Sequence, residues 1–168
     1  CIIELPENMA FKLMGAAMKI SDDPVIKQEW EEILFDLEER TGYSRKRIKQ
    51  SAGIEDQQLR GILPIHPYAA SLLKHISASF ASNQRSMFDF IKNSGNEDLK
   101  GFQWYIDNFG PFSENPFLTV DLLWGFFYDN GKNDLSQNIR QILDRYANLA
   151  KQLDDEEQKV LKAILLFQ

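Results

Sequence analysis

Arg85 is the residue whose type and position most clearly suit anion chemistry. It falls in the first turn of a predicted helix that Ser82 or Asn83 can cap, where the macrodipole disfavours a cation by about 0.3–1 kcal/mol. Two interpretations are open. Either the guanidinium is solvated and pairs with Asp89 one turn later, or its planar fork meets an anion such as a phosphate.

A denser group of cations lies in a helix predicted from Ser44 to about Ala52. Its members, four within five residues, are Arg45, Lys46, Arg47 and Lys49. Such a cluster can contact a nucleic-acid backbone. It can equally neutralise the preceding helix, predicted for residues 24–40 after an Asp23-Pro24 start signal. The acidic residues of that helix, which form a solvated face, are Glu29, Glu31, Glu32, Asp36, Glu38 and Glu39.

The motifs of common catalytic and metal sites are missing from the sequence. The dipeptide Gly131-Lys132 lacks both the upstream glycine and the following Ser or Thr of a phosphate loop. His66 and His75 stand nine residues apart, which is a poor spacing for two metal ligands on one helix. His66 directly precedes Pro67, and we expect it to be a helix-entry residue that binds backbone. The segment is therefore predicted to hold no metal and to catalyse nothing by itself.

Composition limits the class of protein further. The 168 residues, 43% of them hydrophobic, allow one compact domain or two small ones. A net charge of −6 argues against nucleic-acid binding over the whole surface but permits a local basic strip. The single cysteine, Cys1, precludes a disulfide within the chain and suits a reducing cytosol. With no signal peptide and no apolar run of about 18 residues, we expect a cytoplasmic protein without membrane contact.

The elements that must position these residues are helices. Apolar residues recur at helical spacing most clearly in residues 24–40, 65–80, 82–93, 119–130 and 136–153. Only residues 1–5 have the pattern of a strand edge. We predict an all-α fold of about eight or nine helices. It divides into an N-terminal helical segment, residues 1–60, and a second helical domain, residues 61–168, unless the two are continuous.

Aromatic residues concentrate in two of the predicted helices, residues 101–109 and 119–130. Twelve of the 20 aromatic residues are Phe, and such density is typical of a core or of a docking face. If the rings of the docking alternative are exposed, the chain is a helical protein–protein interaction module. Those rings are Trp104, Trp124, Phe126 and Phe127.

A family resemblance rests on three segments of the central pair of helices: PIHP at 64–67, Leu72-Leu73, and FASNQRSMFDF at 80–90. They resemble the pattern "HPL-T-A-L-L-L" followed by "F-A-Q-N-E-R-S-L-F-S-F-L" of large P-loop ATPases from bacterial phage-defence islands, the BREX-type phage-exclusion ATPase and its relatives. Gly101-Phe102 with LTVDLL at 118–123 is similar to the "GF…LTVDLL" stretch of that family. The resemblance spans roughly residues 62–167.

The resemblance implies a place and a role for the chain. It would be the helical region after an AAA+-like nucleotide-binding core, a lid whose last helices lead into a winged-helix region. Both ends of the sequence lie within apolar runs, so we also expect a piece of a longer protein.

The same resemblance implies the cofactors, partners and site of the longer protein. ATP and Mg²⁺ would bind the core, and that core and other defence-complex subunits would be partners, with DNA contact as an alternative. A lid arginine of such ATPases reaches the bound phosphates, and Arg85 maps to that role. Asn83, Gln84 and His66 are its candidate neighbours, and Gln84 stands where the family pattern has Glu.

Overall fold

The computed structural model describes residues 11, 14–16, 18, 22–79, 83–95, 99–114, 116–129 and 137–166, with backbone alone for 75–79, 83–87, 137–139 and 166. Within these ranges the fold is all-α, as the sequence predicts, with nine α-helices and one π-helix. The helices are α2 (Pro24–Arg40), α3 (Gly42–Ala52), α4 (Asp56–Arg60), α5 (Pro67–Ser79), α6 (Asn83–Lys92), α7 (Phe102–Asn108), α8 (Val120–Leu123), η1 (Trp124–Asp129), α9 (Gln137–Ala150) and α10 (Asp155–Leu166).

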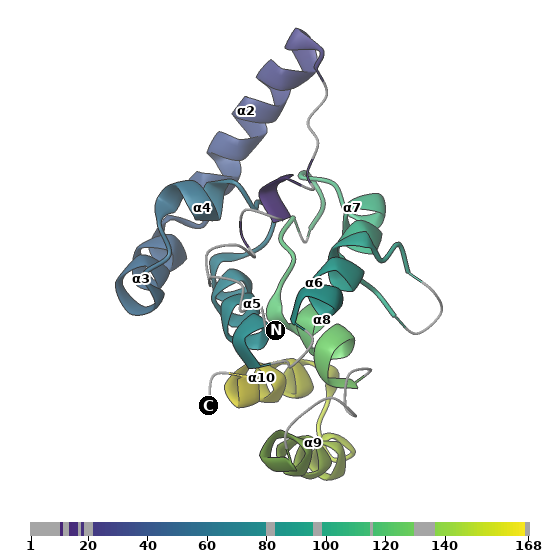
Figure 1. Ribbon diagram of the computed structural model, residues 1–168. Coiled ribbons are helices and arrows are strands. Elements are labelled where there is room, and N and C mark those ends of the chain that lie inside the picture. Colours follow the sequence, from purple (N-terminus) through teal and green to yellow (C-terminus); the bar gives the residue numbers. More distant parts are fainter. Residues whose placement is uncertain are drawn as a thin grey trace, which may run out of the picture.

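Helix α5 packs against three other helices. It contacts α3, α6 and α8, while α10 contacts α8 and α9 (Figure 1). Five consecutive residues of α5, from Ala69 to Leu73, are buried. A helix that is apolar on most of its circumference is stable only when neighbours cover every side. The sequence of α5 therefore places it in the interior.

Two apolar clusters meet at the segment that enters α5, where Ile62 and Ile65 belong to the large cluster and Leu63 to the small one. The large cluster contains α5, α7, α8 and η1, and the small one joins Leu34 and Leu37 of α2 to Leu63. An isolated parallel β-bridge between Ile65 and Leu118 joins the segment before α5 to the segment before α8. The Leu118 amide donates to the Pro64 carbonyl at 3.0 Å. The start of α5 is thus tied to the start of α8.

Helix α2 departs from its predicted apolar stripe in its outer half. Val25 and Ile26 are 65% and 48% exposed, whereas Leu34 and Leu37 are buried. Figure 1 shows why, because the first turns of α2 project beyond the rest of the chain. The predicted start itself is confirmed, since an Asp23 carboxylate oxygen accepts the Val25 amide at 2.8 Å.

Several other predictions meet different outcomes. Helix α3 begins at Gly42 rather than at Ser44, and the predicted helix 119–130 is divided between α8 and η1. The proposed strand edge, residues 1–5, lies outside the described residues. The domain division at residue 60 stays a prediction, although α3 and α5 contact each other across it. In the described part of the chain no helix combines the length and the apolarity that crossing a membrane requires.

Candidate functional site

The predicted nucleotide-sensing residues open helix α6. Asn83, Gln84 and Arg85 occupy its first turn, as the capping pattern predicts. Their side chains lie outside the described residues. The choice between an Arg85–Asp89 pair and an anion site therefore stays open.

His66 caps helix α5. Its Nδ1 accepts the Tyr68 amide at 3.3 Å, and its carbonyl oxygen accepts the Ala70 amide at 2.9 Å. The ring lies 5.8 Å from that of Phe117, edge to face. Burial lowers the pKa of His66, so the imidazole is neutral near pH 7. The histidine is a helix-entry residue that binds backbone.

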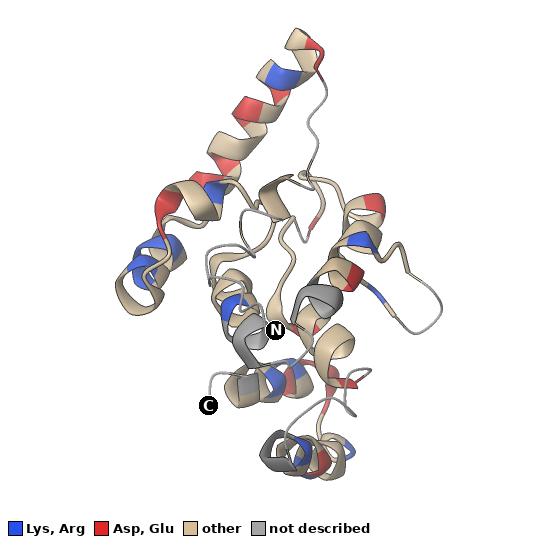
Figure 2. Ribbon diagram, in the orientation of Figure 1, with Lys and Arg blue, Asp and Glu red and all other residues tan. Residues whose placement is uncertain are grey.

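The four cations of α3 divide into two that pair with acidic residues and two that form no ion pair with the residues that the structure describes. Figure 2 shows acidic residues along α2 and basic ones on α3. Arg45 is 8% exposed and donates to Glu38 Oε1 at 2.7 Å and to the Asp56 carbonyl oxygen at 3.2 Å. Lys49 Nζ lies 3.0 Å from Asp56 Oδ2. These two cations are thus committed to acidic residues of the chain itself.

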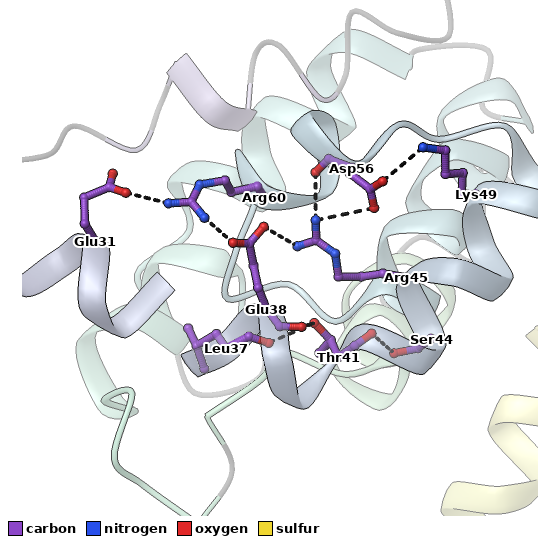
Figure 3. A network of polar contacts seen from close by, with 9 residues as sticks. All are labelled: Glu31, Leu37, Glu38, Thr41, Ser44, Arg45, Lys49, Asp56 and Arg60. Carbon is purple, nitrogen blue, oxygen red and sulfur yellow. Dashed lines mark hydrogen bonds and ion pairs between the residues drawn. The ribbon is translucent and has the colours of Figure 1, made fainter. Parts of the chain in front are cut away.

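Glu38 is the hub of a larger set of charges, which we call the ion network. It receives Arg45 from α3 on one carboxylate oxygen and Arg60 from α4 on the other, and Arg60 also binds Glu31 (Figure 3). The network consists of Glu31, Glu38, Arg45, Lys49, Asp56 and Arg60. It joins α2, α3 and α4 to one another.

The corner between α2 and α3 aims Arg45 at Glu38. Only Thr41 separates the two helices, and its hydroxyl donates to the Leu37 carbonyl at 2.8 Å. The Ser44 hydroxyl donates to the Thr41 carbonyl at 3.0 Å (Figure 3). Both hydroxyls are buried, so they satisfy helix-end carbonyls that water cannot reach.

Two charges of the ion network, Lys49 and Asp56, shift each other's pKa. The hydrogen bond from Lys49 lowers the pKa of Asp56, and the same bond raises the pKa of Lys49. A buried arginine without a partner is costly, so the carboxylates around Arg45 stabilise the fold. The ion network is a structural clamp rather than a ligand site.

Lys46 and Arg47 are the other two cations of α3. Both are exposed, and neither forms an ion pair with any residue that the structure describes. Tyr43, 75% exposed, precedes them by three and four residues, which places the three side chains on one face of α3. Lys49 is exposed as well but is paired with Asp56, so Lys46 and Arg47 are the two predicted nucleic-acid contacts that no ion pair with the described residues occupies.

The proposed aromatic docking face is wrong. Trp124, Phe126 and Phe127 are 1%, 7% and 2% exposed, and Trp104 is half-buried. Phe90 of α6 explains the burial, because its ring lies 5.1 Å from Phe126 and 5.3 Å from Phe127. Three of the four rings are therefore core residues and do not reach a partner.

A cavity that the sequence did not reveal opens beside these rings. Its volume is about 490 Å³, and it lies between α7, the segment before α8, η1 and α10. We call it the aromatic cavity. The lining residues that matter below are Lys100, Trp104, Tyr105, Phe109, Phe126 and Lys159. Gly125, within an otherwise bulky run, was the one sequence signal for open space there.

Metal binding finds no support in the described part of the chain, where no three His, Cys, Asp or Glu residues could share an ion.

Comparisons with known proteins leave the family open. A scan against family models gave no match, and neither did searches of curated proteins and of solved structures. The family resemblance thus stands on the residues quoted above.

Proposed function

We propose that the chain is a helical coupling segment of a large ATP-hydrolysing protein of phage defence. It relays the nucleotide state of an upstream core to neighbouring domains, as an AAA+ lid with a lead-in to a winged-helix region. ATP and Mg²⁺ belong to that core. The core, and other subunits of the defence complex, are the partners.

The observation that carries this proposal is the position of α5. It contacts α6, which opens with the candidate sensor residues, and on another side it contacts α3. Lys74 of α5 also donates to the carbonyl of Ala52, the last residue of α3, at 3.0 Å. Because close-packed helices move as units, a shift of α6 reaches α3 through α5.

The ion network extends this route to α2. It fixes α3 to α2 and α4 through Glu38, so displacement of α3 carries the projecting helix with it. The exposed Val25 and Ile26 near the tip of α2 then offer a contact to a neighbouring domain. Input at α6 and output at α2 lie at opposite ends of one packed series of helices.

Arg85→Ala in the longer protein tests the input. We expect ATP turnover to fall about tenfold or more with nucleotide binding retained, because a guanidinium aimed at developing charge acts in the transition state. Arg40→Ala is the matched control, since Arg40 forms a surface pair with Asp36 within α2. Unchanged turnover in Arg85→Ala removes Arg85 from the mechanism.

We infer a second candidate function from the outward face of α3, which is contact with single-stranded DNA. Tyr43 offers a ring on which a base can stack, and Lys46 and Arg47 offer two cations for phosphates. Two such contacts predict a slope of about −1.4 for log affinity against log salt.

A gel-shift titration with a single-stranded oligonucleotide tests this second function. Lys46→Gln with Arg47→Gln should abolish the shift. Lys27→Gln with Lys92→Gln, two exposed lysines on α2 and α6, should preserve it. An absent or salt-insensitive shift for the unaltered chain disposes of the DNA contact.

A further inference from the structure

The aromatic cavity has the size and wall of a ligand site. Its volume of about 490 Å³ falls within the range of small-molecule pockets, about 300–1,000 Å³. The Tyr105 and Phe109 rings stack at 5.1 Å, and Trp104 meets Phe109 edge to face at 5.6 Å. Tyr105 and Phe126 are buried while Trp104 and Phe109 are half-buried. The interior is thus aromatic, and the mouth is open to solvent.

The wall supplied by η1 is the second observation. A π-helix is rare and often accompanies function. This one contributes Gly125 to the cavity lining, and a Cβ built on Gly125 would meet no heavy atom within 4 Å. Glycine inside a helix costs roughly 0.5–1 kcal/mol relative to alanine. Packing therefore does not require a glycine here, and its missing side chain adds to the open space of the cavity.

The charges at the mouth indicate the sign of the ligand. Lys100 Nζ lies 4.6 Å from the centre of the Trp104 ring and forms no ion pair with the described residues. Lys159, unlike Lys100, has carboxylates beside it. Its hydrogen bond to Glu156, at 2.8 Å, raises the pKa of the amine, and the charge of Asp121 adds to that shift.

Two consequences follow for a bound molecule. The face of Trp104 that a ligand cation would use is already taken by Lys100. Lys159 is paired with Glu156, and the lining carboxylate of Asp121 accepts the Thr119 hydroxyl, so Lys100 is the lysine of the lining that forms no ion pair with the described residues and can meet a ligand charge. An anionic group is favoured at this position and a cationic one is repelled.

We propose that the aromatic cavity binds a small aromatic molecule with one negative charge. Its ring lies among Trp104, Tyr105, Phe109 and Phe126, and its anionic group pairs with Lys100. This site is independent of the coupling role proposed above, because it uses none of the candidate sensor residues.

Titration of the full chain with naphthalene-1-sulfonate, followed by calorimetry and ligand-observed NMR, tests the site. We expect saturable binding of one molecule, and at least fivefold weaker binding of the naphthalen-1-ylmethylammonium cation. Gly125→Leu should weaken sulfonate binding at least tenfold by filling the cavity. Lys100→Gln should weaken it about two- to fivefold, the range of an exposed ion pair, and leave binding of neutral 1-naphthol unchanged.

Matched controls separate the cavity from general effects. Gly42→Leu places the same side chain at a helical glycine of α3 where a Cβ also meets nothing within 4 Å. Lys27→Gln removes an exposed lysine of α2. Both should bind the sulfonate as the unaltered chain does. Equal affinity for anion and cation, unchanged binding by Gly125→Leu, or a titration that never saturates would overturn the proposal. If Gly125→Leu does not fold, the surface variant Lys100→Gln still decides it.

Discussion

The two ends of the molecule are held together by different forces. The N-terminal unit, α2 to α4, has a small apolar cluster and depends on the ion network around Glu38. The aromatic end, α7 to α9 with η1, depends on buried rings such as Trp124, which lies 4.8 Å from Tyr146 and 5.3 Å from Tyr128. Ion pairs fix the orientation of the groups that they join, and their contribution to stability depends on salt. Buried rings stabilise the fold in proportion to the apolar area that they bury, and this contribution depends little on salt.

This difference suits the two ends to different tasks. A clamp of charges can hold a projecting helix such as α2 at a defined angle with little apolar surface. A packed aromatic core can instead hold a cavity open, because its rings are rigid and close-packed. The N-terminal unit is thus built to transmit position and the aromatic end to enclose space.

The largest expected effect is at the aromatic end. Trp124→Ala should lower the free energy of unfolding by about 3–5 kcal/mol, because a fully buried ring is lost and a void is left. Urea denaturation measures it. The loss should be equal in low and high salt. A loss that shrinks in high salt would contradict an apolar origin.

The next effect is at the ion network. Glu38→Gln should cost about 2–4 kcal/mol, because buried Arg45 loses its nearest carboxylate. Denaturation at rising salt should show the difference from the unaltered chain becoming smaller. The neighbouring Glu39→Gln, at an exposed position, should change stability by less than about 0.5 kcal/mol. Equal effects of the two variants would show that the network stabilises nothing.

A smaller effect concerns pH at the junction of the two ends. Burial lowers the pKa of His66 below its usual 6.5, so the unfolded chain takes up the proton first. The stability that neutral His66 contributes is fully present above the usual pKa of 6.5 and is lost as the pH falls through the lower pKa of the folded state. His66→Asn keeps an acceptor for the Tyr68 amide without titrating. Melting temperatures from pH 5 to 8 should therefore vary less in the variant, and parallel curves would refute the assignment.

The smallest effect is expected for Lys46, which we compare with Arg45 of the same helix. Lys46→Gln should leave the free energy of unfolding within about 0.5 kcal/mol, whereas Arg45→Gln should cost several times more. Urea denaturation of the two variants at the same salt concentration checks this. Similar losses would mean that the buried, paired Arg45 contributes no more to stability than the exposed Lys46.

Much of the fold followed from local signals in the sequence. Asp23-Pro24 marked the start of α2, and apolar residues at helical spacing in residues 65–80 marked the helix that became α5. These signals act within one or two turns, so sequence alone carries them. The sequence also indicated which cations of α3 lie together, because Arg45 and Lys49 are one turn apart and therefore share a face of the helix.

The rest depended on contacts between distant residues. Arg60 reaches Glu38 across 22 positions, which no local pattern specifies. The aromatic runs could not be assigned to core or surface, because both environments use the same residue types. The aromatic cavity is lined by three separate stretches of the sequence, residues 100–109, residues 117–126 and Lys159, so only the lone Gly125 hinted at it.

Hydrogen exchange of the longer protein, with and without a non-hydrolysable ATP analogue, tests the coupling role most directly. Nucleotide should change protection in α6, in α3 and in α2. In Glu38→Gln the change should persist in α6 and disappear from α2. Nucleotide-dependent changes confined to the upstream core, with α2 to α6 unaffected, would contradict the relay.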